Sequence, residues 1–389
     1  MVGEVKAIED VVIFAEDNHL IYLKAFTNAH SYFRKYQIKR TLTSERGTVL
    51  QFYCGRGIFL IVSVLLLFIS KQSLGIILHP SAEPNLVTWT DRPDSDVVGR
   101  WRNNASCVAI SRNCIVTTRH QGGASGEVVI GGRSYSIGSI WNHSSADLRV
   151  VKLENTNLRH FVNLYTDTDE SGQEIRIGGF GKGRGAILQT GGKTYGYSWS
   201  GPSNTIQRWC TNKVNSSTTV SGGYVSQVLV ADFDGIGEGD STIYEGTAAS
   251  WDSGEGWFIY QGGEWKVAAL SRGVETHFVE GHEGDPAYRL YEAWFRDRAD
   301  PNIKTPDYLD GVQISSYASW INSVIPEVLP GDLTGDDWVD ISDISVFAGF
   351  WSETNCQAPD FCLGADSEPD GDVDWDDFAV LLGNWLSSF

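Results

Sequence analysis

The sequence predicts a mostly β protein that ends in a small α-helical module. The 389-residue chain contains 42 Gly and 14 Trp, and 12% of its residues are aromatic, a composition that favours strands and turns over helices. Short runs of Val, Ile, Thr and Tyr separated by turns recur between residues 106 and 315. Helical periodicity appears after residue 316. The length is sufficient for two or three domains.

The negative charge of the chain is concentrated at its C-terminal end. The net charge of the whole sequence is −19. Residues 331–389 contain 14 Asp and Glu and no Lys or Arg, so this segment carries −14 and the preceding 330 residues carry −5. The pattern gives no indication of a basic surface for nucleic acid. An acidic block is often a solvated tail, but the periodic spacing of these acids favours a metal site.

The N-terminal region contains one apolar run that is typical of an export signal. Residues 1–56 carry no motif, and the apolar run covers residues 57–70. Because a membrane span needs about 20 residues, the run fits the core of a signal peptide, with 73–75 as a small-residue cleavage site. We expect 57–82 to be a signal peptide or a signal-anchor. The protein is then secreted or on the cell surface, and contacts a membrane only if 57–70 remains as an anchor.

Four of the six cysteines are spaced for disulfides. Cys356 and Cys362 close a short loop, and Cys107 and Cys114 flank the turn of a hairpin. The chain has no CxxC pair, which argues against a zinc ribbon. Both pairings would fit an oxidising compartment.

The strand pattern places three polar residues at the ends of predicted strands. His120 follows a hairpin at 107–118, Asp147 heads an alternating strand at 146–153, and Ser253 lies in a tight turn before an apolar strand at 257–259. The other predicted elements are a hairpin at 126–137, strands at 174–181, 265–270 and 310–315, strands with long loops at 182–246, an irregular insertion at 275–309, and a short helix at 317–325 that Pro326 stops.

His120, Asp147 and Ser253 are the residue types that nucleophilic acyl transfer requires. The reaction needs a hydroxyl, a base that takes its proton and an acid that orients the base. Each residue alone has an ordinary structural explanation, because histidines are often structural and Asp-Ser-Gly is common in loops. Their order and their positions at strand ends make them candidates for one site.

The segments around these residues resemble the trypsin/chymotrypsin family of serine peptidases. Thr117-Thr-Arg-His120 is similar to the family's Thr-Ala-Ala-His, and Trp251-Asp-Ser-Gly-Glu-Gly256 to its Gly-Asp-Ser-Gly-Gly-Pro. The resemblance covers about residues 95–325. Further matches are the strand Ala146–Leu153, the Ser271-Arg-Gly273 segment, and the closing strand and helix at 310–314 and 317–321.

That resemblance implies a double antiparallel β-barrel over residues 83–326 and a polypeptide substrate, with no cofactor for catalysis. Ser253 would be the nucleophile, His120 the general base and Asp147 the residue that orients it. The backbone N–H groups of Trp251 and Ser253 would form the oxyanion hole. The substrate pocket would be formed by Thr247, Ser271, Arg272 and Gly273.

Several positions depart from the family pattern. Trp251 stands where the oxyanion-hole Gly is expected, and Glu255 replaces a second Gly. Thr247, in place of Asp at the pocket floor, removes the basis for a preference for Arg or Lys, and Arg272 indicates a preference for acidic side chains. We expect Asp252 to pair with an internal cation or with backbone donors. These departures leave open a catalytically inactive binding module with a peptidase fold.

The acidic C-terminal segment, 327–389, contains two loops with EF-hand-like spacing. Oxygen ligands occur at loop positions 1, 3, 5, 9 and 12, each loop leads into a predicted helix (341–352 and 375–387), and position 12 is Asp. Asp337 replaces the turn-making Gly of the first loop, whereas Gly371 is retained in the second. The candidate calcium ligands are Asp332, Thr334, Asp336, Trp338 (through its carbonyl), Asp340 and Asp343, and Asp366, Glu368, Asp370, Asp372, Asp374 and Asp377.

Duplicated loop-helix units of this kind resemble a type I dockerin. The resemblance implies two Ca²⁺ sites and binding to a cohesin-like protein partner, which would attach the enzyme to a scaffold or surface. Two alternatives remain open from the residues alone. The tail is a calcium-stabilised cap without a partner, or it is the functional part and the β domain is its cargo.

Overall fold

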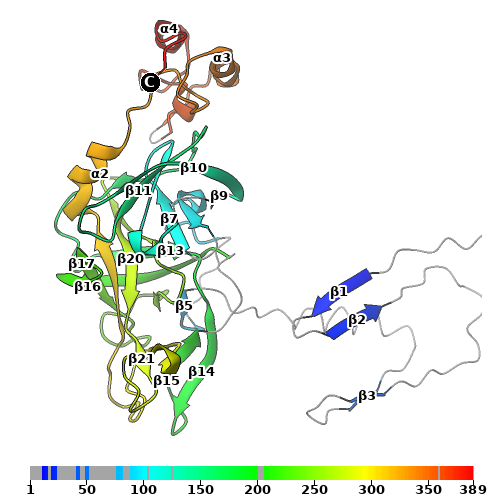
Figure 1. The fold of residues 1–389 in the computed structure, drawn as a ribbon, viewed down its shortest axis with the longest axis vertical. Helices are drawn as coiled ribbons and strands as arrows, with labels where there is room; N and C mark the ends of the chain where they lie inside the picture. The colour runs from blue at the N-terminus through cyan, green and yellow to red at the C-terminus, as the bar shows by residue number, and fades with distance from the viewer. Residues whose placement is uncertain are drawn as a thin grey trace, which may run out of the picture. The chain divides into compact units, whose positions relative to one another are not determined.

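The computed structural model describes residues 76–81, 88–102, 105–123, 126–199, 206–357 and 360–388, together with the backbone of four N-terminal strands (Figure 1). The chain divides into two compact units, Met1–Lys71 and Gln72–Phe389. In the first unit, β1 (Val11–Ala15) pairs with β2 (His19–Leu23), and β3 (Thr41–Thr43) with β4 (Val49–Gln51). The predicted export signal at 57–70 and its cleavage site lie outside the described residues. Within the described part of the chain, no helix is long and apolar enough to cross a membrane.

The first half of the second unit is a closed antiparallel barrel with the strand order β10-β11-β8-β7-β6-β9. Successive residues of its strands face opposite sides, as the period of two requires. Ala109, Ile115 and Val151 fill the barrel, whereas Val108 and Val116 pack in a cluster that includes Trp209 and Phe258 of the following strands. The strands are β6 (Val98–Trp101), β7 (Ala105–Ala109), β8 (Cys114–Thr117), β9 (Glu127–Ile130), β10 (Arg133–Asn142) and β11 (Arg149–Leu153).

A second antiparallel ring follows along the chain. Strands β20, β19, β13, β16, β17 and β24 pair in that order, and the pairing of β20 with β24 closes the ring. Ile175, Ile177, Trp257 and Ile259 are buried in its core. The all-β class predicted from the sequence is confirmed. The strands are β13 (Glu174–Gly179), β16 (Arg208–Gly222), β17 (Tyr224–Asp232), β19 (Gly256–Gln261), β20 (Glu264–Val274) and β24 (Tyr308–Gln313), with β12 (Asn163–Leu164) added in parallel to β20.

Small sheets occupy the segments whose sequence pattern was weak. The predicted irregular insertion at 275–309 contains three short strands, one of which pairs with β15 to extend the β14–β15 hairpin. Tyr197, Phe233 and Phe295 form a buried aromatic cluster with this sheet. The elements are β5 (Ile77–Leu78) with β18 (Gly246–Thr247), β14 (Arg184–Thr190), β15 (Lys193–Trp199) and β23 (Glu292–Trp294), and β21 (His277–Phe278) with β22 (Arg289–Leu290).

The C-terminal segment, 327–389, contains two α-helices and a small core of its own. These helices, α3 (Ile341–Phe347) and α4 (Trp375–Gly383), are shorter than the sequence predicts, and helix α2 (Ala318–Val324) lies just before the segment. The core contains Phe347 and Leu381, whereas Ile341, Trp351 and Leu382 are exposed. A helix of two turns can bury only part of an apolar stripe, so the rest of the stripe remains at the surface.

One of the two predicted disulfides is present and the other is not. Cys356 is bonded to Cys362, as predicted. The predicted pairing of Cys107 with Cys114 is wrong, because both are free thiols. Cys107 packs inside the first barrel and Cys114 in the cluster on the other side of the sheet. Neighbouring strands bring the backbones together, but the alternation of side chains separates the two sulfur atoms.

Burial predicts that these thiols do not react in the folded protein. Cys107, Cys114 and Cys210 are fully buried, and burial raises the pKa of Cys114 to about 11. Since the thiolate is the reactive form, iodoacetamide at pH 8 should label all three only after denaturation. Peptide mass mapping gives the result. Labelling of Cys107 in the native state, or a Cys107–Cys114 disulfide in the non-reduced map, would contradict this arrangement.

Candidate active site

His120, Asp147 and Ser253 are joined by hydrogen bonds, although they are far apart in the chain. The Nδ1 of His120 lies 2.6 Å from Oδ2 of Asp147, and its Nε2 lies 3.0 Å from Oγ of Ser253. His120 follows β8 and Asp147 precedes β11, which are paired strands of the first barrel, whereas Ser253 precedes β19 of the second. The three predicted residues therefore meet between the two barrels.

Asp147 is held in one orientation by its surroundings. Its side chain is buried, its Oδ1 accepts the backbone N–H of His120 at 2.7 Å, and its own N–H donates to Oγ of Ser226 at 2.9 Å. A carboxylate on Nδ1 favours the tautomer in which Nε2 accepts a proton. A residue missed by the sequence reasoning, Gln121, also has its Nε2 3.0 Å from Nε2 of His120. Its amide N–H therefore competes with the Ser253 hydroxyl for the same nitrogen.

The turn that carries Ser253 is fixed by the buried side chain of Asp252. Its Oδ1 accepts the N–H of Gly181 at 2.5 Å, and its Oδ2 accepts that of Ala249 at 2.8 Å. The buried guanidinium of Arg208 supplies a favourable charge, and burial raises the pKa of Asp252 to about 6. Asp252 thus has both the backbone donors and the internal cation expected from the sequence.

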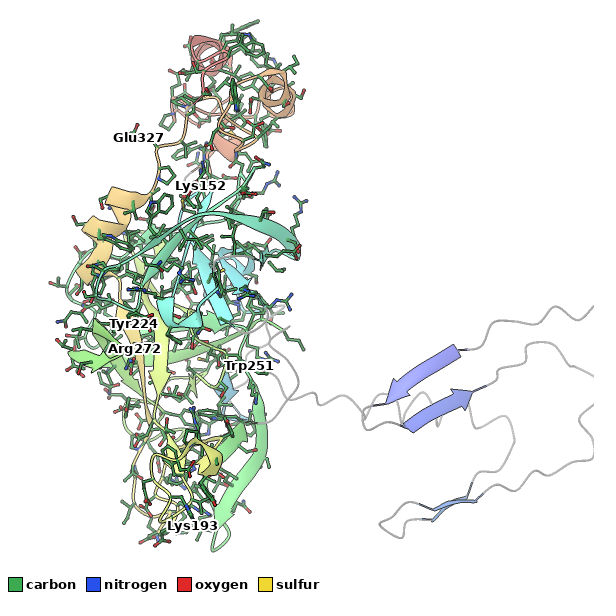
Figure 2. All side chains as sticks on the ribbon, viewed as in Figure 1. Lys152, Lys193, Tyr224, Trp251, Arg272 and Glu327 are labelled. Atoms are coloured by element: carbon green, nitrogen blue, oxygen red, sulfur yellow. A yellow bond between two sulfur atoms is a disulfide. The ribbon has the colours of Figure 1, made fainter. Side chains whose placement is uncertain are left out.

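Trp251 occupies the backbone conformation that the family reserves for glycine. Its φ is 76°, in the left-handed region that costs an L-residue about 1–2 kcal/mol. The indole ring is partly exposed (Figure 2), with Nζ of Lys182 4.8 Å from its centroid. Lys182 also donates its N–H to the carbonyl of Ser250. Among the described residues, the N–H groups of Trp251 and Ser253 have no protein acceptor.

Glu255, the second departure from the family, is a fully buried carboxyl beneath the site. Its Oε1 accepts the hydroxyl of Ser271 at 2.7 Å, and that hydroxyl accepts the indole N–H of Trp257 at 2.8 Å. Within the described structure its Oε2 has no hydrogen-bond partner. Burial and the neighbouring Asp252 raise its pKa well above the ordinary value. These surroundings favour the protonated form of Glu255.

A cavity of about 420 Å³ opens beside the hydrogen-bonded residues. His120 and Ser253 line it, as do the predicted substrate-binding residues Ser271, Arg272 and Gly273. Thr247 is not among the lining residues. It is buried and paired with Ile77 between β18 and β5.

Arg272, labelled in Figure 2, is paired within the protein. Its guanidinium makes a two-pronged ion pair with the buried Asp310, with Nε–Oδ1 2.7 Å and Nη2–Oδ2 2.8 Å. A bidentate pair of this kind occupies the Nε–Nη2 edge of the guanidinium and offsets its charge. The second arginine on the cavity wall, Arg289, was missed because it lies in the insertion that has no recognisable motif.

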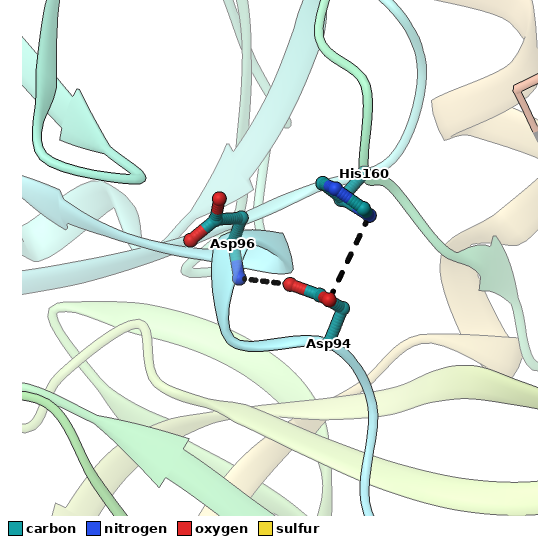
Figure 3. A group of neighbouring side chains, drawn as sticks. All are labelled: Asp94, Asp96 and His160. Atoms are coloured by element: carbon teal, nitrogen blue, oxygen red, sulfur yellow. Dashed lines mark hydrogen bonds and ion pairs between the residues drawn. The ribbon is translucent and has the colours of Figure 1, made fainter. Parts of the chain in front are cut away.

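A separate cluster of Asp94, Asp96 and His160 has the composition of a metal site (Figure 3). One ligand atom from each lies within 4.8 Å of the other two. However, Asp94 already accepts the backbone N–H of Asp96 and lies 3.8 Å from Nδ1 of His160. Arg159 lines the two cavities that adjoin the cluster, and its positive charge opposes a cation. We assign no metal to it.

The two acidic loops of the C-terminal segment have the same local structure. Asp340 and Asp374 each cap a helix, with Asp343 and Asp377 completing a capping box. Asp343 and Asp377 are fully buried, and each also accepts two backbone N–H groups near the start of its loop. At the sixth position Asp337 has φ 67° and Gly371 has φ 104°. Asp therefore takes the left-handed conformation for which the sequence motif uses Gly, as Asp does more readily than most residues.

The donor set of these loops fits calcium. Glu368, Asp374 and Asp376 have ligand atoms within 4.8 Å of one another, although Asp376 was not among the predicted ligands. Within the described structure, the Oδ1 of Asp372 is buried without a hydrogen-bond partner. Its hydrogen bond to Asp370 and repulsion from that carboxylate raise the pKa of Asp372. Hard carboxylate oxygens gathered without a Lys or Arg in the segment are the ligands that Ca²⁺ prefers.

Comparisons with known proteins give structural neighbours but no family assignment. No protein-family model and no curated protein matches the chain. Neuropsin, a serine protease expressed in the limbic system of mouse brain, is 14% identical with a TM-score of 0.37, over 60% of this chain and 96% of that chain. The inactive form of the Rv3671c protease is 11% identical with a TM-score of 0.37, over 60% and 98%. We therefore base the proposed function on the geometry of the site alone.

The buried acid beneath the site predicts a pH-dependent effect of Glu255→Gln. A carboxyl whose pKa is raised by folding destabilises the protein as the pH rises from its unfolded pKa, about 4.3, through its folded pKa. The variant removes this cost, so at pH 8 it should be more stable than the wild type and unfold at a higher temperature. The gain should vanish near pH 4. Calorimetry at both pH values measures it, with the exposed Glu154→Gln as the control. An equal effect at the two pH values would contradict the assignment.

Proposed function

We propose that this protein is a serine endopeptidase that hydrolyses peptide bonds. The observation that carries the proposal is the position of His120, whose two ring nitrogens lie 2.6 Å from Asp147 and 3.0 Å from Ser253. These distances are those of a base that is oriented on one side and in contact with its nucleophile on the other. The adjoining cavity gives a substrate access to the serine.

In the proposed reaction, Oγ of Ser253 attacks the carbonyl carbon of the peptide while Nε2 of His120 takes the hydroxyl proton. His120 then gives that proton to the leaving amine, and water releases the acyl group by the same two steps. Asp147 stabilises the imidazolium without taking a proton. The N–H groups of Trp251 and Ser253 stabilise the oxyanion, and one such donor is typically worth about 2.7–4 kcal/mol of barrier.

A second candidate is a catalytically inactive binding module. It is favoured by Gln121, whose amide reaches the nitrogen of His120 that must accept the serine proton. It is also favoured by the strained φ of Trp251, because relaxation of that residue would turn its N–H away from the cavity. The buried side chain of Asp252 opposes this relaxation by closing the turn onto Ala249 and anchoring it to Gly181.

The proposal extends to the C-terminal segment as a calcium-dependent attachment module. Asp332, Asp336, Asp340 and Asp343 would hold one Ca²⁺, with Thr334 and the carbonyl of Trp338. Asp366, Glu368, Asp370, Asp374 and Asp377 would hold the other, with Asp372. The cation would neutralise carboxylates that otherwise repel one another. Export of the protein, through the segment at 57–82, would bring the module to an extracellular calcium supply.

Exposed aromatic side chains support a protein partner for this module. Trp351 and Trp375 are both exposed, with ring centroids 5.0 Å apart. Trp338, Trp385 and Leu386 are also exposed on the same segment. Apolar groups gathered at the surface favour protein contacts, and a cohesin-like protein is the partner that we propose.

A fluorophosphonate probe tests the catalytic proposal. Such probes react with an activated serine, so the wild type should be labelled at Ser253 and Ser253→Ala should not be labelled. His120→Ala should slow labelling by about 10²-fold or more, because the base is lost. Mass spectrometry of the probe adduct measures the site and the rate. Ser323→Ala, which lies on α2 outside the cavity, is the matched control.

Absence of labelling in folded wild-type protein, together with absence of peptide turnover, would favour the inactive binding module. Labelling that His120→Ala leaves unchanged would also contradict the proposal, since the serine would then react without its base.

Calcium removal tests the proposed metal sites. Isothermal titration of the chelated full chain with CaCl₂ should show two binding events, and Asp377→Asn should remove one of them. At a calcium concentration about 100 times the dissociation constant, binding stabilises the module by about 2.7 kcal/mol. The melting temperature of the C-terminal segment should therefore fall in chelator. Equal melting curves and flat titrations would contradict the calcium proposal, and Asp360→Asn serves as the control outside both loops.

A further inference from the structure

The cavity beside Ser253 has two arginines and no carboxylate on its wall. The lining residues that carry a charge at neutral pH are Arg272 and Arg289, together with His120 when it is protonated. Arg272 is neutralised by its bidentate pair with Asp310. The remaining fixed charge of the cavity is that of Arg289.

Arg289 differs from Arg272 in the partners of its guanidinium. No described Asp or Glu is within ion-pair distance of it, and its Nε is buried without a hydrogen-bond partner. Two aromatic faces hold it, with the guanidinium carbon 5.5 Å from the ring of Trp199 and 5.4 Å from that of Tyr291. Stacking on aromatic faces positions a guanidinium while its N–H edges stay available for a planar anion.

The other groups around the cavity preserve this positive charge. The Nζ of Lys182 lies 5.3 Å from the ring centroid of Tyr291, a lining residue of the cavity, and so adds a second positive charge beside that residue. Behind the wall, Ser271 separates the cavity from Glu255. Burial raises the pKa of Glu255 well above its ordinary range, which favours the neutral form of that group. Nothing among the described cavity residues therefore opposes an anionic ligand.

We propose that this cavity binds an acidic side chain, glutamate or aspartate, of the substrate residue that precedes the scissile bond, and that Arg289 is the residue that recognises its carboxylate. The inference rests on the proposed peptidase function and names its substrate class. A carboxylate would make charge-assisted hydrogen bonds to the guanidinium edge. A glutamine in the same place would leave the guanidinium N–H groups of Arg289 with a weaker partner, and such a mismatch typically lowers kcat/KM by about ten-fold or more.

Matched fluorogenic peptides test the proposal. The two peptides of each pair differ only in the residue before the leaving group, which is Glu or Gln in one pair and Asp or Asn in the other. The measured quantity is the kcat/KM of the acidic peptide divided by that of its amide counterpart. We expect a ratio of about ten or more in the wild type, and a ratio near one in Arg289→Gln. Arg289→Lys should give an intermediate ratio, because it keeps the charge but not the planar fork. Arg298→Gln is the matched control, since Arg298 also stacks on a tryptophan of the insertion but does not line the cavity.

A charge reversal separates recognition from a structural role. Arg289→Glu should cleave the matched peptide with Lys before the leaving group better than the wild type does, an effect that loss of packing alone would not produce. Equal wild-type cleavage of the Glu and Gln peptides, or a ratio unchanged in Arg289→Gln, would overturn the inference. In that case fluorophosphonate labelling of wild-type Ser253 would leave the peptidase proposal intact. No labelling and no cleavage of any peptide would remove both proposals.

Discussion

The buried carboxylate of Asp252 holds the turn on which the candidate active site depends. Its Oδ2 accepts the N–H of Ala249, which closes the turn around Trp251, and its Oδ1 accepts the N–H of Gly181, which anchors the turn to the segment after β13. A turn closed and anchored in this way can keep Trp251 at a positive φ, although that conformation costs about 1–2 kcal/mol for an L-residue. The same turn presents Ser253 to His120. Strain at Trp251 is therefore maintained by hydrogen bonds to its neighbour, not by the tryptophan side chain.

Burial of three ionisable groups under one turn sets the charge of the site. Arg208, Asp252 and Glu255 are all almost inaccessible to solvent. The charge of Arg208 favours the ionised form of Asp252, whereas burial and the neighbouring Asp252 raise the pKa of Glu255 well above its ordinary value. An isolated charge in a buried environment is costly, so the surroundings of Glu255 favour its neutral form. The carboxyl of Glu255 thus serves as a hydrogen-bonding group beneath the site, where it accepts the hydroxyl of Ser271.

The two acidic loops of the C-terminal segment repeat each other in structure as they do in sequence. Each loop begins with an aspartate that accepts backbone N–H groups and ends with a capping box that starts a helix. Lys152 of β11 contacts Asp337 of the first loop, with Nζ 2.5 Å from Oδ2, and the N–H of Thr156 donates to the carbonyl of Gly335. The first loop is thereby linked to the β11 strand that follows Asp147. A change in the structure of the first acidic loop would therefore act on β11, the strand that follows Asp147.

The sequence by itself determined the strand-rich class, the three residues His120, Asp147 and Ser253, the Cys356–Cys362 bond and the paired acidic loops. The class, the disulfide and the acidic loops follow from local patterns, namely alternation, turn residues and spacing, whereas the three residues were assigned to one site by the resemblance of their segments to a known family. Only the tertiary structure decided which charges are neutralised and which side chains are buried. It pairs Arg272 with Asp310 and buries Thr247 between two short strands. It also turns Cys107 and Cys114 to opposite faces of the sheet and brings Arg289 from an unpatterned insertion to the cavity. The physical reason is that local patterns depend on neighbours in the chain, whereas burial and ion pairing depend on residues that are distant in sequence and meet only when the barrels close.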